Sequence, residues 1–205
     1  MAYFPFFQDL QDQKGLMIGA GKVALHKARI ILEYGARLCV VAPEIDPEFR
    51  KMKGVILRQR TFIPEDLCEV NFVICATDDG EINRQVAGMC RERGVLVNSV
   101  DDRENCSFFF PALIHRGMLT IGICTGGASP SAASALKKNI EHSLPADVED
   151  ILNYLNRIRP KIKKEFSQQQ TRAVIFQKIW EACLEYGRAL TEEEEQEIMD
   201  EQRRE

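Results

Sequence analysis

The chain has 205 residues, of which 45% are hydrophobic and 28% are charged, and its formal net charge at pH 7 is -4. This composition is typical of a water-soluble globular protein, and the length suffices for one domain with an appendage. The net negative charge provides no positive electrostatic field that would attract nucleic acid. The chain also contains no run of about 18 apolar residues, the length needed to span a membrane. The first ten residues lack the basic start and long apolar stretch of a signal peptide, so we expect a cytoplasmic protein.

The cysteines and histidines give no sign of a disulfide framework or a resident metal. There are seven cysteines, an odd number, and no Cys-x-x-Cys pair occurs. The three histidines do not have the spacing of a zinc site. We therefore expect reduced thiols and no structural metal.

The first elements form a strand–turn–helix–strand unit. The hydrophobic pattern predicts a strand, a helix and a second strand at residues 15–18, 23–34 and 37–42. The first turn reads G-x-G-x-x-A: Gly19 would allow a tight turn, and Gly21 would let the backbone approach a pyrophosphate. Ala24 would let the helix pack close to the strand, and Gly35 is suited to end that helix. This arrangement is typical of a dinucleotide-binding unit.

The same pattern assigns residues to parts of a dinucleotide. Lys22 and Val23 open the helix, where free N–H groups and the helix dipole would hold the phosphates. Pro43 ends the second strand, and Glu44 could accept a hydrogen bond from a ribose hydroxyl, with a solvated loop glutamate as an equal alternative. No Lys or Arg directly follows this strand to bind a 2′-phosphate, so we expect NAD in preference to NADP.

Strands and helices continue to alternate along the middle of the chain. We expect helices at 47–52 and 81–93, and strands at 55–60, 72–79, 95–100 and 119–124. Ala76 and Thr77 lie near the carboxyl end of their strand, so they should line the nicotinamide-ribose side of the crevice. Asp79 is expected to cap the next helix. Asp101 follows the strand at 95–100 and is either a candidate acid or base or part of a hydrated turn.

A second glycine-containing turn precedes a later helix. Thr125, Gly126 and Gly127 follow a predicted strand, and Ser129 is expected as the N-cap of the helix. The hydroxyls and unpaired N–H groups of this turn suit a ligand that carries carboxylates, and Lys137 and Lys138 would add positive charge.

The remainder of the chain is predicted to be helical. The expected helices cover residues 132–143, 148–166 and 171–186. An apolar stripe in the second of them indicates core or dimer contact rather than a cofactor site. Its members are Ile151, Leu152, Leu155, Ile158 and Ile162. The acidic run at 192–195 is expected to be solvated and partly frayed.

Several of these motifs, in this order, resemble the sirohaem-synthase family, specifically its precorrin-2 dehydrogenase/sirohydrochlorin ferrochelatase members. The matching segments are Pro5-Phe6-Phe7 and the stretches at 19–24, 76–79, 98–101, 109–112 and 125–130. The resemblance covers roughly residues 3–166. No methyltransferase module follows, so the chain resembles the stand-alone form of what is also the amino-terminal module of the fused enzyme.

The resemblance implies a specific reaction. It is the NAD-dependent dehydrogenation of precorrin-2, a carboxylate-rich reduced tetrapyrrole, to sirohydrochlorin. Asp101 matches the family's catalytic carboxylate, the turn from Thr125 to Ser129 would receive substrate carboxylates, and His115 is a further candidate contact. Insertion of Fe²⁺ as a substrate could follow, and a homodimer is implied. The alternatives are a dehydrogenase without chelatase activity and an NAD-sensing regulatory module.

Together these observations predict an α/β fold. We expect a Rossmann-type parallel sheet, a small α/β dimerisation segment and a C-terminal helical domain. The expected boundaries are 1–112 for the NAD-binding domain, 113–145 for the dimerisation and substrate-binding segment, and 146–205 for the helical domain.

Overall fold

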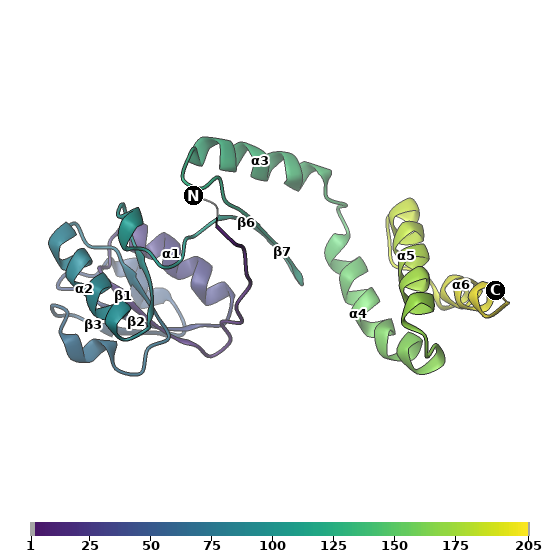
Figure 1. The fold of residues 1–205 in the computed structure, drawn as a ribbon, viewed down its shortest axis with the longest axis horizontal. Helices are drawn as coiled ribbons and strands as arrows, with labels where there is room; N and C mark the ends of the chain where they lie inside the picture. Colours follow the sequence, from purple (N-terminus) through teal and green to yellow (C-terminus); the bar gives the residue numbers. More distant parts are fainter. Residues whose placement is uncertain (1–2, 205) are drawn as a thin grey trace. The chain divides into compact units, whose positions relative to one another are not determined.

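A five-stranded parallel sheet organises the first half of the chain (Figure 1). The structure is a computed structural model that describes residues 3–204. It divides into a sheet unit, residues 4–109, and a helix-rich unit, residues 110–204 with Tyr3. The elements of the sheet unit are β1 Lys14–Ile18, α1 Lys22–Glu33, β2 Arg37–Val41, η1 Pro47–Lys51, β3 Val55–Arg58, η2 Pro64–Leu67, β4 Phe72–Cys75, α2 Gly80–Glu92, β5 Leu96–Ser99 and η3 Arg103–Asn105.

The strand order places a crevice beside the first glycine turn. The order is β3-β2-β1-β4-β5, and every neighbouring pair is parallel. Ile18 is in register with both Val41 and Cys75, so the carboxyl ends of the three central strands lie at one edge. The order reverses between β1 and β4, and ligands of open α/β sheets bind at such a switch point.

Apart from the edge strand β3, the sheet is buried on both faces, which explains its nearly continuous apolar strands. One face forms a cluster with α2 that consists of Leu16, Ile18, Val41, Leu67, Val73, Cys75, Val86, Ala87, Cys90 and Val97. Side chains that alternate with these, such as Met17, Val40 and Ile74, are fully buried on the opposite face. Helices α1 and α2 flank the sheet, and α1 presents small residues to it, including Ala24 and Ala28 (Figure 1).

A buried ion-pair network stabilises the β3 side of the sheet unit. The Asp66 side chain is 1% exposed and lies 2.7 Å from Arg58 Nη1 and 2.6 Å from Arg60 Nη2. It also accepts a hydrogen bond from the Ile63 N–H at 3.1 Å. The Arg60 guanidinium is the main cause that lowers the pKa of the Asp66 carboxyl to about 2. The charge is therefore retained on a buried side chain.

The helix-rich unit begins with a hairpin and continues with four helices. Its elements are β6 Ala112–Arg116, β7 Leu119–Ile123, α3 Pro130–Ser143, α4 Val148–Glu165, α5 Gln169–Tyr186 and α6 Glu192–Arg204. β6 and β7 pair antiparallel, and α3 contacts both strands. The predicted apolar stripe supplies Ile151, Ile158 and Ile162 to a core shared with α5 and α6, so these three residues belong to the interior of this unit.

The predicted fold class is confirmed, with two local corrections. The sheet is parallel and of Rossmann type, and its helices begin and end close to the predicted residues. Residues 47–51 form a 3₁₀ helix, in which Pro47 opens the turn and Asp46 caps it, and the predicted strands after the first are shorter than predicted. The predicted domain boundaries after residues 112 and 145 stay a prediction. In the structure the chain passes from the sheet unit to the helix-rich unit after residue 109, and residue 145 lies inside the helix-rich unit.

The expectation of a frayed acidic tail was wrong. Residues 192–204 form α6, and Glu195 is only 5% exposed. Its carboxylate accepts hydrogen bonds from Tyr154 Oη at 3.2 Å and Lys161 Nζ at 2.7 Å, both from α4. Met199, fully buried in the same core, holds the helix against its neighbours. Glu195 can be buried because α4 supplies a donor and a countercharge.

No helix among residues 3–204 is long and apolar enough to span a membrane.

Candidate active site

Gly19 is required by the fold itself. It follows β1 with a φ of +99°, and a Cβ built on it would lie 2.2 Å from the carbonyl oxygen of Ala76, which follows β4. The backbone bonds Gly19 N to Val41 O at 3.0 Å and Ala76 N to Ile18 O at 2.8 Å tie the turn to both neighbouring strands. A side chain at this position would push the strand ends apart.

Gly21 is not required by the fold. Its backbone angles, φ -84° and ψ -170°, suit any residue, and a Cβ on it would meet nothing within 4 Å. It is the N-cap of α1, and among the described residues no side chain caps this helix or places an acid in its first turn. The helix start therefore presents unpaired N–H groups and a positive dipole end to open space, with Lys22 beside them. This is an anion-binding arrangement.

Two adjoining cavities open at this edge of the sheet. The Asp101 cavity has a volume of about 720 Å³ and the Glu44 cavity about 690 Å³. Both lie within the range of small-molecule sites. They share Gly21, Ala76, Thr77 and Asp78. The eight predicted cofactor residues all line one or both of them: Gly19, Gly21, Lys22, Val23, Pro43, Glu44, Ala76 and Thr77.

Thr77, which lines both cavities, is hydrogen-bonded to a buried amide side chain that the sequence analysis did not identify. Asn83 is 3% exposed, donates from Nδ2 to Thr77 O at 3.0 Å and accepts from Thr77 Oγ1 at 2.8 Å. The predicted cap is confirmed, since Asp79 Oδ1 accepts from the N–H groups of Glu81 and Ile82 at 2.9 and 3.2 Å. An asparagine one turn after a helix cap was the available signal for Asn83.

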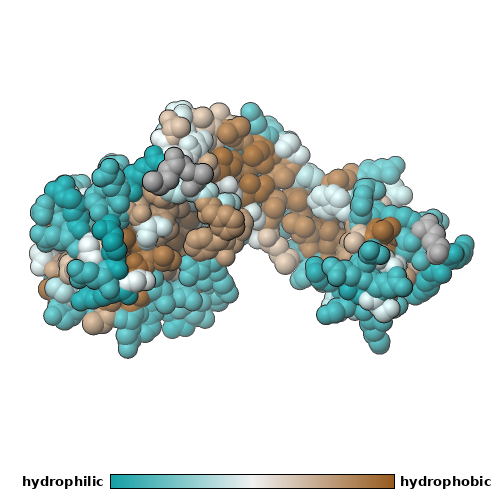
Figure 2. Space-filling model, viewed as in Figure 1, coloured by the Kyte–Doolittle hydropathy of each residue, from teal (hydrophilic) through white to brown (hydrophobic). Residues whose placement is uncertain are grey.

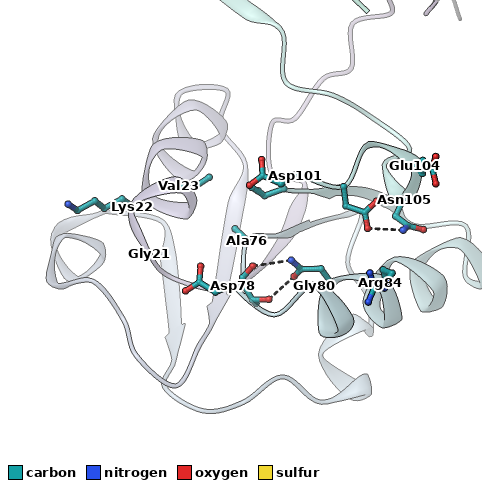
Figure 3. A pocket seen from close by; sticks show the side chains of 14 residues that line it. Gly21, Lys22, Val23, Ala76, Asp78, Gly80, Arg84, Asp101, Glu104 and Asn105 are labelled. Atoms are coloured by element: carbon teal, nitrogen blue, oxygen red, sulfur yellow. Dashed lines mark hydrogen bonds between the residues drawn. The ribbon is translucent and has the colours of Figure 1, made fainter. Parts of the chain in front are cut away.

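Asp101 lies on the cavity that carries the α1 N-terminus. It follows β5 with a φ of +58°, its side chain is exposed, and it lines the Asp101 cavity together with Val23 and Ala76 (Figure 3). Asp101 stands in a turn, so the alternative of a hydrated turn stays open for it, whereas Asp102 is half-buried and its carboxylate accepts a hydrogen bond from Asn105 Nδ2 at 2.8 Å. Asp101 is thus placed where it could exchange a proton with a bound molecule.

A half-buried lysine of α1 interacts electrostatically with the loop that follows β5. Lys27 is one helical turn beyond Val23, and burial lowers its pKa while its interactions with Cys106 and Asp101 oppose that shift. The spacing of four residues from Val23 was the signal that could have identified it. Further lining residues that the sequence did not single out are Arg84, Glu104 and Asn105.

The second glycine turn, in the helix-rich unit, is also formed. Gly126 and Gly127 have φ values of +65° and +80°. Thr125 Oγ1 donates to Ser129 O at 3.1 Å, and Ser129 Oγ caps α3 by accepting from Ala132 N at 3.1 Å. The predicted cap is confirmed, while the role of the turn in ligand binding stays a prediction.

The two remaining predicted substrate residues have partners inside the helix-rich unit. Lys137 Nζ lies 3.8 Å from Glu141 on α3, and both side chains are partly exposed. His115 is exposed on β6, with Nδ1 3.2 Å from Thr120 Oγ1. Within residues 3–204 no group of three or more His, Cys, Asp or Glu side chains is arranged to hold a metal ion.

The chain is similar to a described protein family and to several known proteins. Residues 6–112 match the family model described as "Putative NAD(P)-binding". The chain is 36% identical over 182 residues to Siroheme synthase of Ectopseudomonas mendocina, and 36% identical over 188 residues to Siroheme synthase of Chromobacterium violaceum. These matches cover 88% and 90% of this chain but 39% of each relative, so the chain spans about two fifths of their length.

A solved structure shares the whole fold. The structure of SirC, precorrin-2 dehydrogenase, is 22% identical, has a TM-score of 0.76, and covers 99% of this chain and 100% of that one. The resemblance to the sirohaem-synthase family that the motifs indicated is thereby confirmed, while the role of the glycine turn in nucleotide binding stays a prediction. By the match over the sheet unit, this chain belongs to the NAD(P)-binding family.

Proposed function

We propose that the chain is an NAD-dependent dehydrogenase that converts precorrin-2 to sirohydrochlorin in sirohaem biosynthesis. The observation that carries the proposal is the position of Asp101 on the cavity lined by the N-terminus of α1. A sensor of NAD would need the anion-binding turn but no exposed carboxylate beside it. The similarity to siroheme synthases and to SirC, named a precorrin-2 dehydrogenase, supports the choice of substrate.

The residues present fit a bound dinucleotide. The N–H groups after Gly21 would hold the pyrophosphate, and the open space where a Cβ of Gly21 would stand leaves room for it. Glu44, exposed on its cavity, would accept a hydrogen bond from the adenosine ribose, which favours NAD over a cofactor with a 2′-phosphate. Ala76 and Thr77 would border the nicotinamide ribose. NAD⁺, when bound, accepts the hydride.

Asp101 would supply the acid–base chemistry of the step. Its carboxylate is exposed on the cavity and would take up the proton that precorrin-2 releases together with the hydride. The substrate's own carboxylates would bind the second turn through Thr125, the N–H groups of Gly126 and Gly127, and Ser129. Lys137 and His115 would contribute further contacts.

A second activity, the insertion of Fe²⁺ as a substrate into sirohydrochlorin, is favoured by the same exposed carboxylate. Asp101 could accept the protons that the pyrrole nitrogens lose. The family resemblance includes both activities, and a dehydrogenase without chelatase activity is the alternative. The two are separated by supplying sirohydrochlorin with Fe²⁺ or Co²⁺ and following the absorbance of the metallated product.

We further propose that the protein is a cytoplasmic homodimer. Apolar side chains gather over α3, the hairpin and the start of α4 (Figure 2), and Met118 and Leu136 are 59% and 48% exposed there. Exposed apolar patches of this kind mark protein interfaces. The seven cysteines are free thiols, which fits a reducing compartment. Sedimentation at micromolar concentration would test the dimer.

The decisive experiment is spectroscopic. The protein is incubated with precorrin-2 and either NAD⁺ or NADP⁺, and the appearance of the sirohydrochlorin spectrum is followed together with NADH absorbance. We expect product with NAD⁺, little with NADP⁺, and almost none from Asp101→Asn. NAD binding without turnover by the unmodified protein would support the sensor alternative and refute the enzyme.

A further inference from the structure

β5 is an edge strand whose outer side is covered by side chains of a loop. Its inner side pairs with β4, as in the bond from Val100 N to Cys75 O at 2.9 Å. On the outer side, the Val97 N–H donates to Ser107 Oγ at 2.7 Å, and Ser107 N donates to Val97 O at 2.8 Å. Residues 106 and 107 therefore take the place of a neighbouring strand, which exposed strand edges otherwise lack.

Cys106 continues this pairing one step further along β5. Its Sγ accepts from the Ser99 N–H at 3.1 Å, and lies 3.1 Å from Ser99 O and 3.2 Å from Asp102 O. Asn98 Nδ2 lies 3.6 Å from the same sulfur. Burial raises the pKa of the Cys106 thiol, so at neutral pH the sulfur keeps the proton that it donates to one of the two carbonyls.

The backbone atoms that Cys106 holds stand on either side of Asp101. Ser99 precedes Asp101 by two residues and Asp102 follows it directly. Asp101 has a φ of +58°, in the left-handed region that a residue with a Cβ adopts at a cost. Such a backbone conformation persists when several contacts with the surrounding structure constrain it. The backbone bond from Asp102 N to Ser99 O, at 3.4 Å, closes the short turn, and the thiol adds a second constraint because it contacts both ends of the turn with one atom.

We propose that Cys106 is a positioning residue, which clips the loop after β5 and thereby holds the Asp101 carboxylate on the cavity. This inference rests on the proposed function, because it assigns the clip to the acid–base group of that reaction. Cys106 itself does not touch the reacting atoms in this assignment. It acts through the direction in which Asp101 projects.

The kinetic test compares Cys106→Ala with Cys106→Ser. Alanine removes donor and acceptor, and we expect kcat for precorrin-2 to fall about tenfold to a hundredfold, with the KM for NAD changed less than about threefold. Serine keeps a donor and two lone pairs, and should restore kcat to within about threefold. Two controls are matched: Cys68→Ala removes an exposed thiol, and Cys90→Ala removes a fully buried one from the core. Cys90→Ala should lower Tm without lowering kcat.

A second readout does not depend on activity. Amide hydrogen exchange in peptides that span residues 98–107 should be faster in Cys106→Ala than in the unmodified chain, and intermediate in Cys106→Ser. Unchanged hydrogen exchange in Cys106→Ala would refute the proposal that the thiol orders the loop. Faster exchange with an undiminished kcat would refute the proposal that the thiol positions Asp101 for the reaction. If the unmodified chain does not oxidise precorrin-2, the proposed function fails, and exchange alone then decides whether the thiol orders the loop.

Discussion

Replacing Gly21 with aspartate should separate folding from cofactor binding. Gly21 is the N-cap of α1 in an extended conformation, with open space where a side chain would project. Aspartate is a preferred N-cap, and its carboxylate could accept from the N–H groups of Val23 or Ala24. Better capping and a negative charge at the positive end of the helix should raise the unfolding free energy by about 0.5–1 kcal/mol. That corresponds to a Tm higher by a few degrees.

The same substitution should almost abolish NAD binding. The carboxylate would occupy the N–H groups that the pyrophosphate needs, and it would stand close to the negative charge of that group. Two like charges about 4 Å apart at an effective dielectric constant of about 20 repel by about 4 kcal/mol. This is roughly a thousandfold increase in the Kd for NAD.

Calorimetric titration of NAD and thermal unfolding of the same samples would measure both effects. Gly88→Asp adds the same charge on α2, where a Cβ also meets nothing within 4 Å, and should leave NAD affinity unchanged. Gly19→Ala should show the opposite pattern, a lower Tm, because its Cβ would collide with Ala76 O at 2.2 Å. An NAD affinity of Gly21→Asp within about threefold of the unmodified chain would refute the placement of the pyrophosphate.

The remaining predictions concern carboxylates and cations outside the glycine turn. Asp101→Asn should keep NAD affinity but lower kcat for precorrin-2 by ~10²-fold or more, because an amide cannot take up the proton; near-normal turnover would place the base elsewhere. Replacing Lys137 and Lys138 together with alanine should raise the apparent KM several-fold at unchanged kcat, since the ground state and the transition state lose the same binding energy, and an unaltered KM would make them surface charges. Asp66→Asn should lower the unfolding free energy by about 2 kcal/mol at pH 7, because Arg60 holds the pKa of the Asp66 carboxyl at about 2, below its ordinary value of 3.8. Because the folded pKa is depressed, this contribution is present above about pH 4 and is lost as the pH falls toward 2. The unfolding free energies of the two proteins should therefore converge in acid, and a difference that stays constant would contradict the assignment.

The nucleotide-binding half could be predicted closely because its signals are local. The apolar strands, the turn at Gly19 and the helix end at Gly35 depend on neighbouring residues, and their spacing reflects the geometry of one strand or one helix. The motif already assigns the tight turn to Gly19 and the approach of a pyrophosphate to Gly21. Only the structure shows that a Cβ on Gly19 would collide with Ala76, which is distant in the chain.

The loop after β5 shows the same limit at the candidate site. Asp101 could be identified as a carboxylate near a strand end, but its left-handed backbone and its partners could not. Cys106 looked like one more buried thiol, because its role depends on the outer edge of β5 having no neighbouring strand among those described. Asn83 was missed for a similar reason, since its bonds to Thr77 form only when β4 and α2 meet.

The acidic C-terminal helix α6 shows most clearly which features the sequence determines and which only the tertiary structure decides. By itself the sequence determined most of the elements, their order, the parallel sheet and the position of the glycine turn, because these follow from periodicity and backbone geometry within short segments. It could not determine that Glu195 is buried, since the cost of burying a carboxylate is offset by Tyr154 and Lys161, which lie far away in the chain. Tertiary structure alone decides such pairings, because a charge is stabilised by whatever group the fold brings within hydrogen-bonding distance.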